Sequence, residues 1–155
     1  MSKILKNRFD RIVNENLPKQ LKIYAVLAEN PLHTDMFHQL GIGLKTVLKK
    51  LGRIDDFKGI YILLENCKPV YIDESSNVLQ RILQQFKGSS KYQRKLAHTM
   101  ANIKSANNSL YTVNEALEEM KNMNLVLLEL PDDLEREITK LYLQCHFDCM
   151  YNIYE

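Results

Sequence analysis

Apolar residues in the first third of the chain recur every three or four positions, which is the spacing of one face of a helix. One stripe runs over residues 5–13, a second over residues 21–26 and a third over residues 37–51. Gly41 and Gly43 lie inside the third stripe and argue against an unbroken helix there, because glycine is a poor helix former. The pattern predicts that the N-terminal part of the chain is helical.

The period of the pattern changes after Asp56. Residues 59–64 and 70–72 are short runs rich in β-formers on either side of a polar turn, which predicts a β-hairpin. Residues 125–130 form another short apolar run and predict a third, central strand. The stretches between and after these runs return to helical spacing. The sequence therefore predicts an α/β fold in which a three-stranded antiparallel sheet is flanked by helices.

This change of period also suggests how the chain is divided. Residues 1–56 are predicted to form a helical N-terminal extension, and residues 57–155 a small α/β domain. A length of 155 residues suits one such domain with a short extension.

Composition and charge limit the kinds of function. Hydrophobic residues make up 45% and charged residues 26% of the chain, as in ordinary globular proteins. A net charge of +2 and a pI near 8.4 fall short of a dedicated nucleic-acid binder, so any DNA surface must be a local patch. Three cysteines favour reduced thiols and a cytoplasmic location. No secretory signal or membrane-spanning run is evident, so no membrane partner is expected.

Several residues of the predicted hairpin and of the region after it form a recognisable set. Gly59-Ile60-Tyr61 is followed by Tyr71-Ile72, then by Arg81 on the next predicted helix, and by Tyr151-Asn152 near the end of the chain. This set resembles the GIY-YIG nuclease superfamily. The resemblance covers roughly residues 57 to 155.

The resemblance implies metal-dependent cleavage of DNA. Phosphodiester hydrolysis needs an activated water, a Lewis acid on the phosphate and a cation that offsets the extra negative charge. By the resemblance, Tyr61 and Tyr71 would present their hydroxyls to one cleft, with Tyr61 taking the proton of the water. Arg81 would stabilise the phosphoryl group. A glutamate on a late helix would hold Mg²⁺ or Mn²⁺.

Three positions depart from the pattern that the resemblance implies. Asp73 stands where the second strand should carry glycine, and adds bulk and negative charge where phosphate should approach. Gln85 replaces a histidine and cannot shuttle a proton near neutral pH. Lys140 falls where close relatives carry the metal glutamate, counting twelve residues back from Asn152. The spacing of other relatives falls instead on Glu137, which would preserve a metal site.

Basic residues cluster near the middle of the chain. Lys87, Lys91, Arg94 and Lys95 surround the loop at Ser89-Ser90, with Tyr92 among them. Together with Asn152 they are candidates for binding nucleic acid, since such clusters can follow a phosphate backbone. A solvated helix face is the alternative explanation.

Three functions fit the sequence. The first is a pseudo-nuclease that has lost catalysis and binds DNA or regulates an active enzyme. The second is an active divalent-metal-dependent endonuclease that uses Glu137 as a shifted metal ligand. The third is a protein-interaction or inhibitor module that works through the N-terminal helices. Three altered chemical positions are explained more simply by lost catalysis than by three separate replacements.

Overall fold

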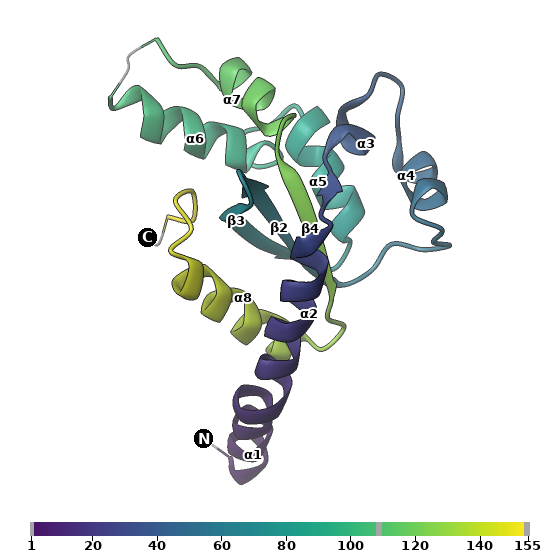
Figure 1. Ribbon diagram of the computed structural model, residues 1–155, viewed down its shortest axis with the longest axis vertical. Coiled ribbons are helices and arrows are strands. Elements are labelled where there is room, and N and C mark those ends of the chain that lie inside the picture. Colours follow the sequence, from purple (N-terminus) through teal and green to yellow (C-terminus); the bar gives the residue numbers. More distant parts are fainter. Residues whose placement is uncertain (1, 108–109, 154–155) are drawn as a thin grey trace.

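The computed structural model describes residues 2–107 and 110–153, and it contains a four-stranded antiparallel sheet with helices on both faces (Figure 1). The strands, in spatial order, are β1 (Leu32–His33), β4 (Asn124–Glu129), β2 (Gly59–Glu65) and β3 (Lys68–Ser75). The α/β fold, the hairpin of β2 and β3, and the inner position of β4 confirm the expectations from the sequence.

The predicted number of strands, three, was wrong. Leu32 and His33 pair with Leu125 and Asn124 of β4 and so add a fourth strand at the edge of the sheet. Two residues are too few to show the alternation by which a strand is recognised in a sequence. Pairing with β4, a segment some ninety residues later in the chain, is what makes these two residues a strand.

The helices divide between the two faces of the sheet. In chain order they are α1 (Lys3–Arg11), the π-helix η1 (Ile12–Asn16), α2 (Leu17–Glu29), α3 (Asp35–His38), α4 (Leu44–Lys50), α5 (Val78–Lys87), α6 (Lys95–Ser105), α7 (Val113–Met120) and α8 (Asp133–Phe147). Helices α3 to α7 pack on one face, while α2 and α8 pack on the other. No helix in the described part of the chain is long and apolar enough to span a membrane.

The strand β2 supplies both cores because successive side chains of a strand point to opposite faces. Tyr61 and Leu63 lie in the core beneath α5 and α6, while Ile60, Ile62 and Leu64 lie in the core beneath α2 and α8. Burial on both faces explains why this strand is an unbroken apolar run in the sequence.

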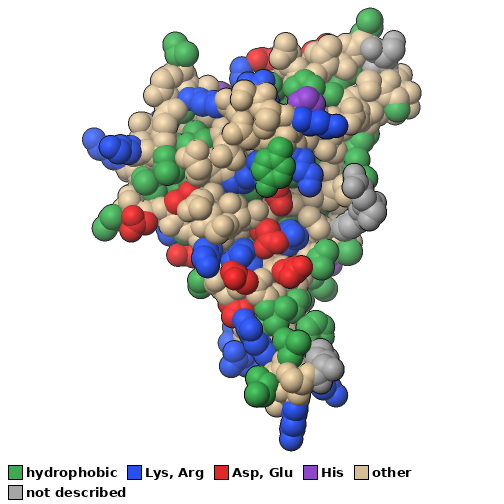
Figure 2. Space-filling view, turned by 180° about the vertical axis from the view of Figure 1, so that it is seen from behind, with side chains coloured by type: hydrophobic (Ala, Val, Ile, Leu, Met, Phe, Trp, Pro, Cys, Tyr) green, Lys and Arg blue, Asp and Glu red, His purple; other side chains and the backbone are tan. Residues whose placement is uncertain are grey.

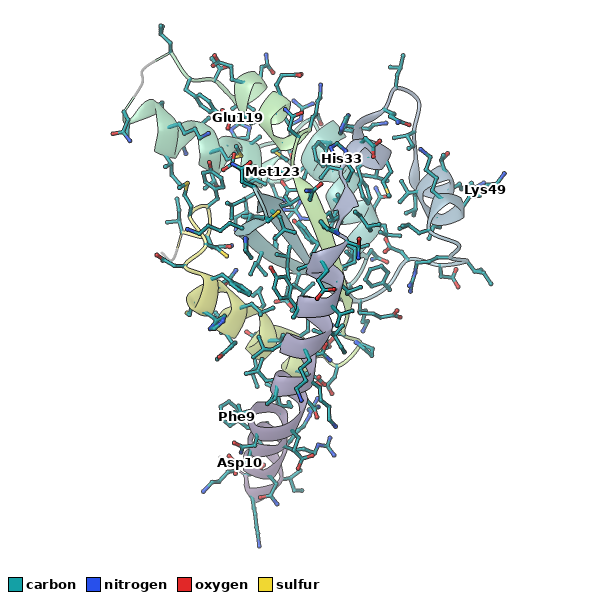
Figure 3. The ribbon with its side chains drawn as sticks, viewed as in Figure 1. Phe9, Asp10, His33, Lys49, Glu119 and Met123 are labelled. Carbon is teal, nitrogen blue, oxygen red and sulfur yellow. The ribbon has the colours of Figure 1, made fainter. Side chains whose placement is uncertain are left out.

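Segments before residue 57 contribute to both cores. Tyr24 of α2 belongs to the core beneath α8, and Phe37 and Val47 belong to the core on the other face. Helix α1, by contrast, buries none of its residues and extends away from the body (Figure 1). Phe9 and Asp10 lie on this extension, far from the sheet (Figure 3). The division at residue 56 remains a prediction, and these contacts favour one folded unit that includes α2.

The start of β2 brings two strands unusually close together. A Cβ atom on Gly59 would lie 2.1 Å from the carbonyl oxygen of Leu128, which is backbone and cannot move aside. Only glycine therefore fits at this position. The close approach helps fix the register in which Tyr61 lies opposite Leu127 on β4 and Asp73 on β3.

The N-terminus of α5 is capped from a distant part of the chain. The Asp56 carboxylate accepts hydrogen bonds from the N–H groups of Leu79 and Gln80, each at 2.9 Å. Asn77 stands at the N-cap position, but its side chain makes no capping bond. Asp56 therefore fixes the helix that carries Arg81 and Gln85.

We expect Asp56→Ala to lower the free energy of unfolding by about 2 kcal/mol, because two amide groups at the start of α5 lose their partner. Urea denaturation followed by circular dichroism measures this change. Asp55→Ala is the matched control, since Asp55 is the neighbouring aspartate and is exposed. Equal effects of the two substitutions would show that the cap does not stabilise the fold.

Candidate functional site

Tyr61 and Tyr71 lie next to each other on paired strands. Tyr61 is opposite Asp73 and Leu63 is opposite Tyr71, so the two tyrosines are diagonal neighbours on one face of the hairpin. Their ring centroids are 6.2 Å apart. The hairpin that the sequence predicts therefore brings the two tyrosines together.

Both tyrosine hydroxyls donate to one carboxylate, that of Asp73. The Oδ2 atom of Asp73 lies 3.4 Å from Oη of Tyr61 and 3.2 Å from Oη of Tyr71. The other carboxylate oxygen accepts a hydrogen bond from the N–H of Glu74 at 2.9 Å. Asp73 thus stands between the two residues predicted to be catalytic and holds both hydroxyls.

Gln85 extends this network into the helices. Its side chain is fully buried, and its Nε2 atom donates to Oη of Tyr61 at 2.8 Å. Its Oε1 atom accepts from the backbone N–H of Leu96 at 3.1 Å. The structure therefore assigns Gln85 to joining α5, α6 and β2.

The environment keeps both phenols protonated. Burial, followed by the neighbouring Tyr71 and Asp73, raises the pKa of Tyr61 well above its ordinary value. Burial and Asp73 also raise the pKa of Tyr71, although Arg81 acts in the opposite direction. A general base must lose its proton near the working pH. These tyrosines are therefore poorly suited to accept a proton from water.

Arg81 lies close to this pair but points toward the loop after α5. Its guanidinium donates to the backbone carbonyls of Gln93 at 3.3 Å and Tyr92 at 3.2 Å. It also lies 4.9 Å from the centroid of the Tyr92 ring. Within the described residues Arg81 makes no ion pair with a carboxylate. Its charge is thus not neutralised by an acidic side chain in this part of the chain.

Lys140 lies on the opposite side of β3 from this network. Its Nζ atom is 2.6 Å from a carboxylate oxygen of Glu74, and Nε of Arg136 is 2.9 Å from the other oxygen. Asp73 and Glu74 are successive strand residues, so their side chains point to opposite faces. Lys140 therefore neutralises Glu74 and, through Glu74, helps fasten α8 to β3.

Glu137, the predicted metal ligand, is exposed on α8. No hydrogen bond or ion pair to it is present among residues 2–107 and 110–153. The same part of the chain contains no group of three histidine, cysteine, aspartate or glutamate side chains placed to hold a metal ion. Glu137 with Lys140 three residues away does not fit a divalent cation, which prefers several oxygen ligands.

Asn152 is occupied by the backbone of β3. Its side-chain amide donates to the carbonyl of Ile72 at 2.8 Å and accepts from the N–H of Ile72 at 2.9 Å. Gln144 donates to the same carbonyl at 2.9 Å, and the N–H of Tyr151 donates to the carbonyl of Val70. The segment that contains Gln144, Tyr151 and Asn152 therefore lies along β3 and covers its free edge. Nothing in the sequence pattern had marked Gln144 for this role.

A hollow of about 490 Å³ lies beside Tyr71 and contains no carboxylate. Its lining is Tyr71, Lys91, Lys95, His98, Thr99, Asn102, Tyr151, Asn152 and Ile153. His98 and Asn102 had not been predicted, although they follow Lys95 at helical spacing on α6. Figure 2 shows Lys and Arg side chains gathered over the middle of one face of the molecule, with Asp and Glu side chains nearer the helical extension.

The four predicted basic residues divide into two pairs. Lys91 and Lys95 are exposed and make no hydrogen bond or ion pair within the described residues. Lys87 instead donates to the carbonyls of Gln39 at 2.9 Å and Ile42 at 2.6 Å. Arg94 lines a different hollow, beside α7. Lys91 and Lys95 are therefore the cations that remain free to meet a ligand near Tyr71.

No family model and no curated protein matches the sequence. Two solved structures are similar: tyrosine-to-phenylalanine point mutants of the GIY-YIG N-terminal endonuclease domain of UvrC from Thermotoga maritima, each bound to its catalytic divalent cation. They are 20% and 18% identical to this chain, cover 68% of it and 93% of their own length, and give a TM-score of 0.41. The similarity found is to the class of domain that the sequence resembles.

The raised pKa values of the buried tyrosines predict that the fold loses stability in alkali. Above about pH 10 the unfolded chain loses phenol protons that the folded chain keeps, so the free energy of unfolding falls as pH rises. Tyr61→Phe should reduce this fall by up to about 1.4 kcal/mol per pH unit. Urea denaturation between pH 9 and 11 measures the slope, with Tyr92→Phe at an exposed position as control. An unchanged slope in Tyr61→Phe would contradict the burial of this phenol.

Proposed function

We propose that this chain is a GIY-YIG nuclease-like protein that binds DNA without cutting it. The observation that carries the proposal is that the Asp73 carboxylate accepts hydrogen bonds from the hydroxyls of both Tyr61 and Tyr71. Beside these tyrosines lies a basic hollow whose lining contains no carboxylate. In this protein the capacity to hold a phosphate backbone is thus separate from the capacity to hydrolyse it.

Three features argue against hydrolysis. The phenols of Tyr61 and Tyr71 are held in their protonated form and are already hydrogen-bonded. The carboxylate of Asp73 places negative charge where a phosphate would have to meet these hydroxyls. The described residues also offer no set of carboxylates around Glu137 that suits Mg²⁺ or Mn²⁺.

Other features favour binding. Arg81, Lys91 and Lys95 are cations on neighbouring segments, and no carboxylate within the described residues pairs with them. A phosphate backbone gains affinity from such cations by releasing bound counterions. Since the net charge of the chain is only +2, the binding energy must come from this local group.

The double variant Lys91→Ala/Lys95→Ala should weaken DNA binding and reduce the slope of log affinity against log salt by about 1.5, since two phosphate contacts are lost. Fluorescence anisotropy with a labelled oligonucleotide measures both effects. The salt concentration is varied between about 50 and 200 mM, the range over which phosphate contacts change the affinity strongly. The matched control is Lys45→Ala/Lys49→Ala, which removes the same charge from exposed positions on α4. Neither Lys45 nor Lys49 lines the hollow that contains Lys91 and Lys95. Equal slopes for the two double variants would place the DNA elsewhere.

Purified protein should not nick supercoiled plasmid in either Mg²⁺ or Mn²⁺, because water activation lacks a suitable base and the metal lacks a ligand set. Nicking is measured on agarose gels for the parent chain and for the Tyr61→Phe and Glu137→Ala variants. Nicking by the parent that disappears in both variants would overturn this proposal. That result would establish the alternative, an active endonuclease with Glu137 as its metal ligand.

A protein-interaction role through the N-terminal helices is a second candidate. It is favoured by α1, which buries no residue and leaves Ile4 82%, Leu5 41% and Phe9 43% exposed. Absence of DNA binding at low salt, together with a stable complex that depends on Phe9, would support this candidate over the first.

A further inference from the structure

Tyr92 is an aromatic residue that the fold leaves in solvent. Its side chain is 76% exposed, and it lies between Lys91 and Gln93 in the loop that follows α5. Hiding a tyrosine ring from water is ordinarily favourable. An exposed ring beside cations matches a ligand that has a flat apolar part and a negatively charged part.

This ring is held in place by Arg81. The guanidinium lies 4.9 Å from the ring centroid and also donates to the carbonyl of Tyr92 itself at 3.2 Å. One face of the ring is therefore backed by a cation. The high exposure leaves the rest of the ring open to a second stacking partner.

The loop around Tyr92 is braced by its own side chains. The Oε1 atom of Gln93 accepts the N–H groups of Ser89 at 2.9 Å and Ser90 at 3.3 Å, while Oγ of Ser90 accepts the N–H of Gln93 at 3.1 Å. A braced loop loses little conformational freedom when a ligand binds. The ring is thus presented on a preorganised support.

Two lysines lie near Tyr92 in the sequence, one on each side of it. Lys91 precedes the ring directly, and Lys95 follows one turn later at the start of α6. Both line the hollow beside Tyr71, which has no carboxylate. Proteins that bind single strands combine such a cationic groove with aromatic rings on which bases stack.

We propose that Tyr92 stacks on an unpaired base, so that the DNA-binding surface prefers single-stranded DNA to duplex. In a duplex the faces of the bases are already stacked, and a side chain reaches only base edges in the grooves. A single strand exposes its base faces while its phosphates meet Lys91 and Lys95. This inference rests on the proposed DNA binding and names the form of DNA that is bound.

The test compares a labelled 15-nucleotide single strand with the blunt duplex formed by annealing that strand to its complement, by fluorescence anisotropy at low salt. Tyr92→Ala should weaken binding of the single strand about 5- to 100-fold, the usual loss of one base stack, and leave duplex binding nearly unchanged. Tyr92→Phe keeps the ring and should bind like the parent chain. The control is Tyr142→Ala, because Tyr142 is an exposed tyrosine on a different element, α8. This substitution should not change the affinity for either DNA.

The outcomes separate this inference from the proposal on which it rests. No binding of either DNA by the parent chain would refute the DNA-binding proposal itself. Binding that is equal for the two DNAs, or unaffected by Tyr92→Ala, would refute only the stacking role. An equal loss for both DNAs in Tyr92→Ala would likewise overturn it, because stacking on an unpaired base cannot serve a duplex.

Discussion

The carboxylate of Asp73 determines what the rest of this site can be. It lies on the edge strand β3 at the register position opposite Tyr61, and it accepts the hydroxyls of Tyr61 and Tyr71. A hydroxyl that donates to a carboxylate is less ready to ionise, and a carboxylate between two hydroxyls excludes a second anion. A single carboxylate thus ties the two tyrosine hydroxyls into one hydrogen-bond network.

Gln85 and Lys140 also have defined partners in the fold. Gln85 donates a hydrogen bond to the hydroxyl of Tyr61 and accepts one from the backbone N–H of Leu96. It therefore ties Tyr61 to the start of α6. On the other face of β3, Glu74 is neutralised by Lys140 and Arg136. Buried or half-buried charges need partners of this kind. Asp73, Gln85 and Lys140 are therefore each held in place by hydrogen bonds or an ion pair within the fold.

The sequence predicted what depends on local pattern and missed what depends on distant contacts. The hairpin, the neighbouring tyrosines and the helix of Arg81 follow from residues close together in the chain. Strand β1 exists only because it pairs with β4, and the cap of α5 comes from Asp56 rather than from the adjacent Asn77. Likewise, the spacing of Asn152 identified a motif position, but only the folded chain shows its amide bound to Ile72. A linear pattern contains no information about such partners.

The charges of this face also decide where a DNA strand would lie in the proposed binding mode. A phosphate placed at the two tyrosines would meet Asp73, and two unit charges about 4 Å apart interact by about 4 kcal/mol near a protein surface. The same phosphate placed over the loop would meet Lys91 and Lys95, which have no acidic partner among the described residues. In the proposed binding mode the phosphates therefore meet Lys91 and Lys95 and not the two tyrosine hydroxyls, which Asp73 occupies. Binding at this surface and hydrolysis at Tyr61 consequently oppose each other, since each requires the phosphate in a different place.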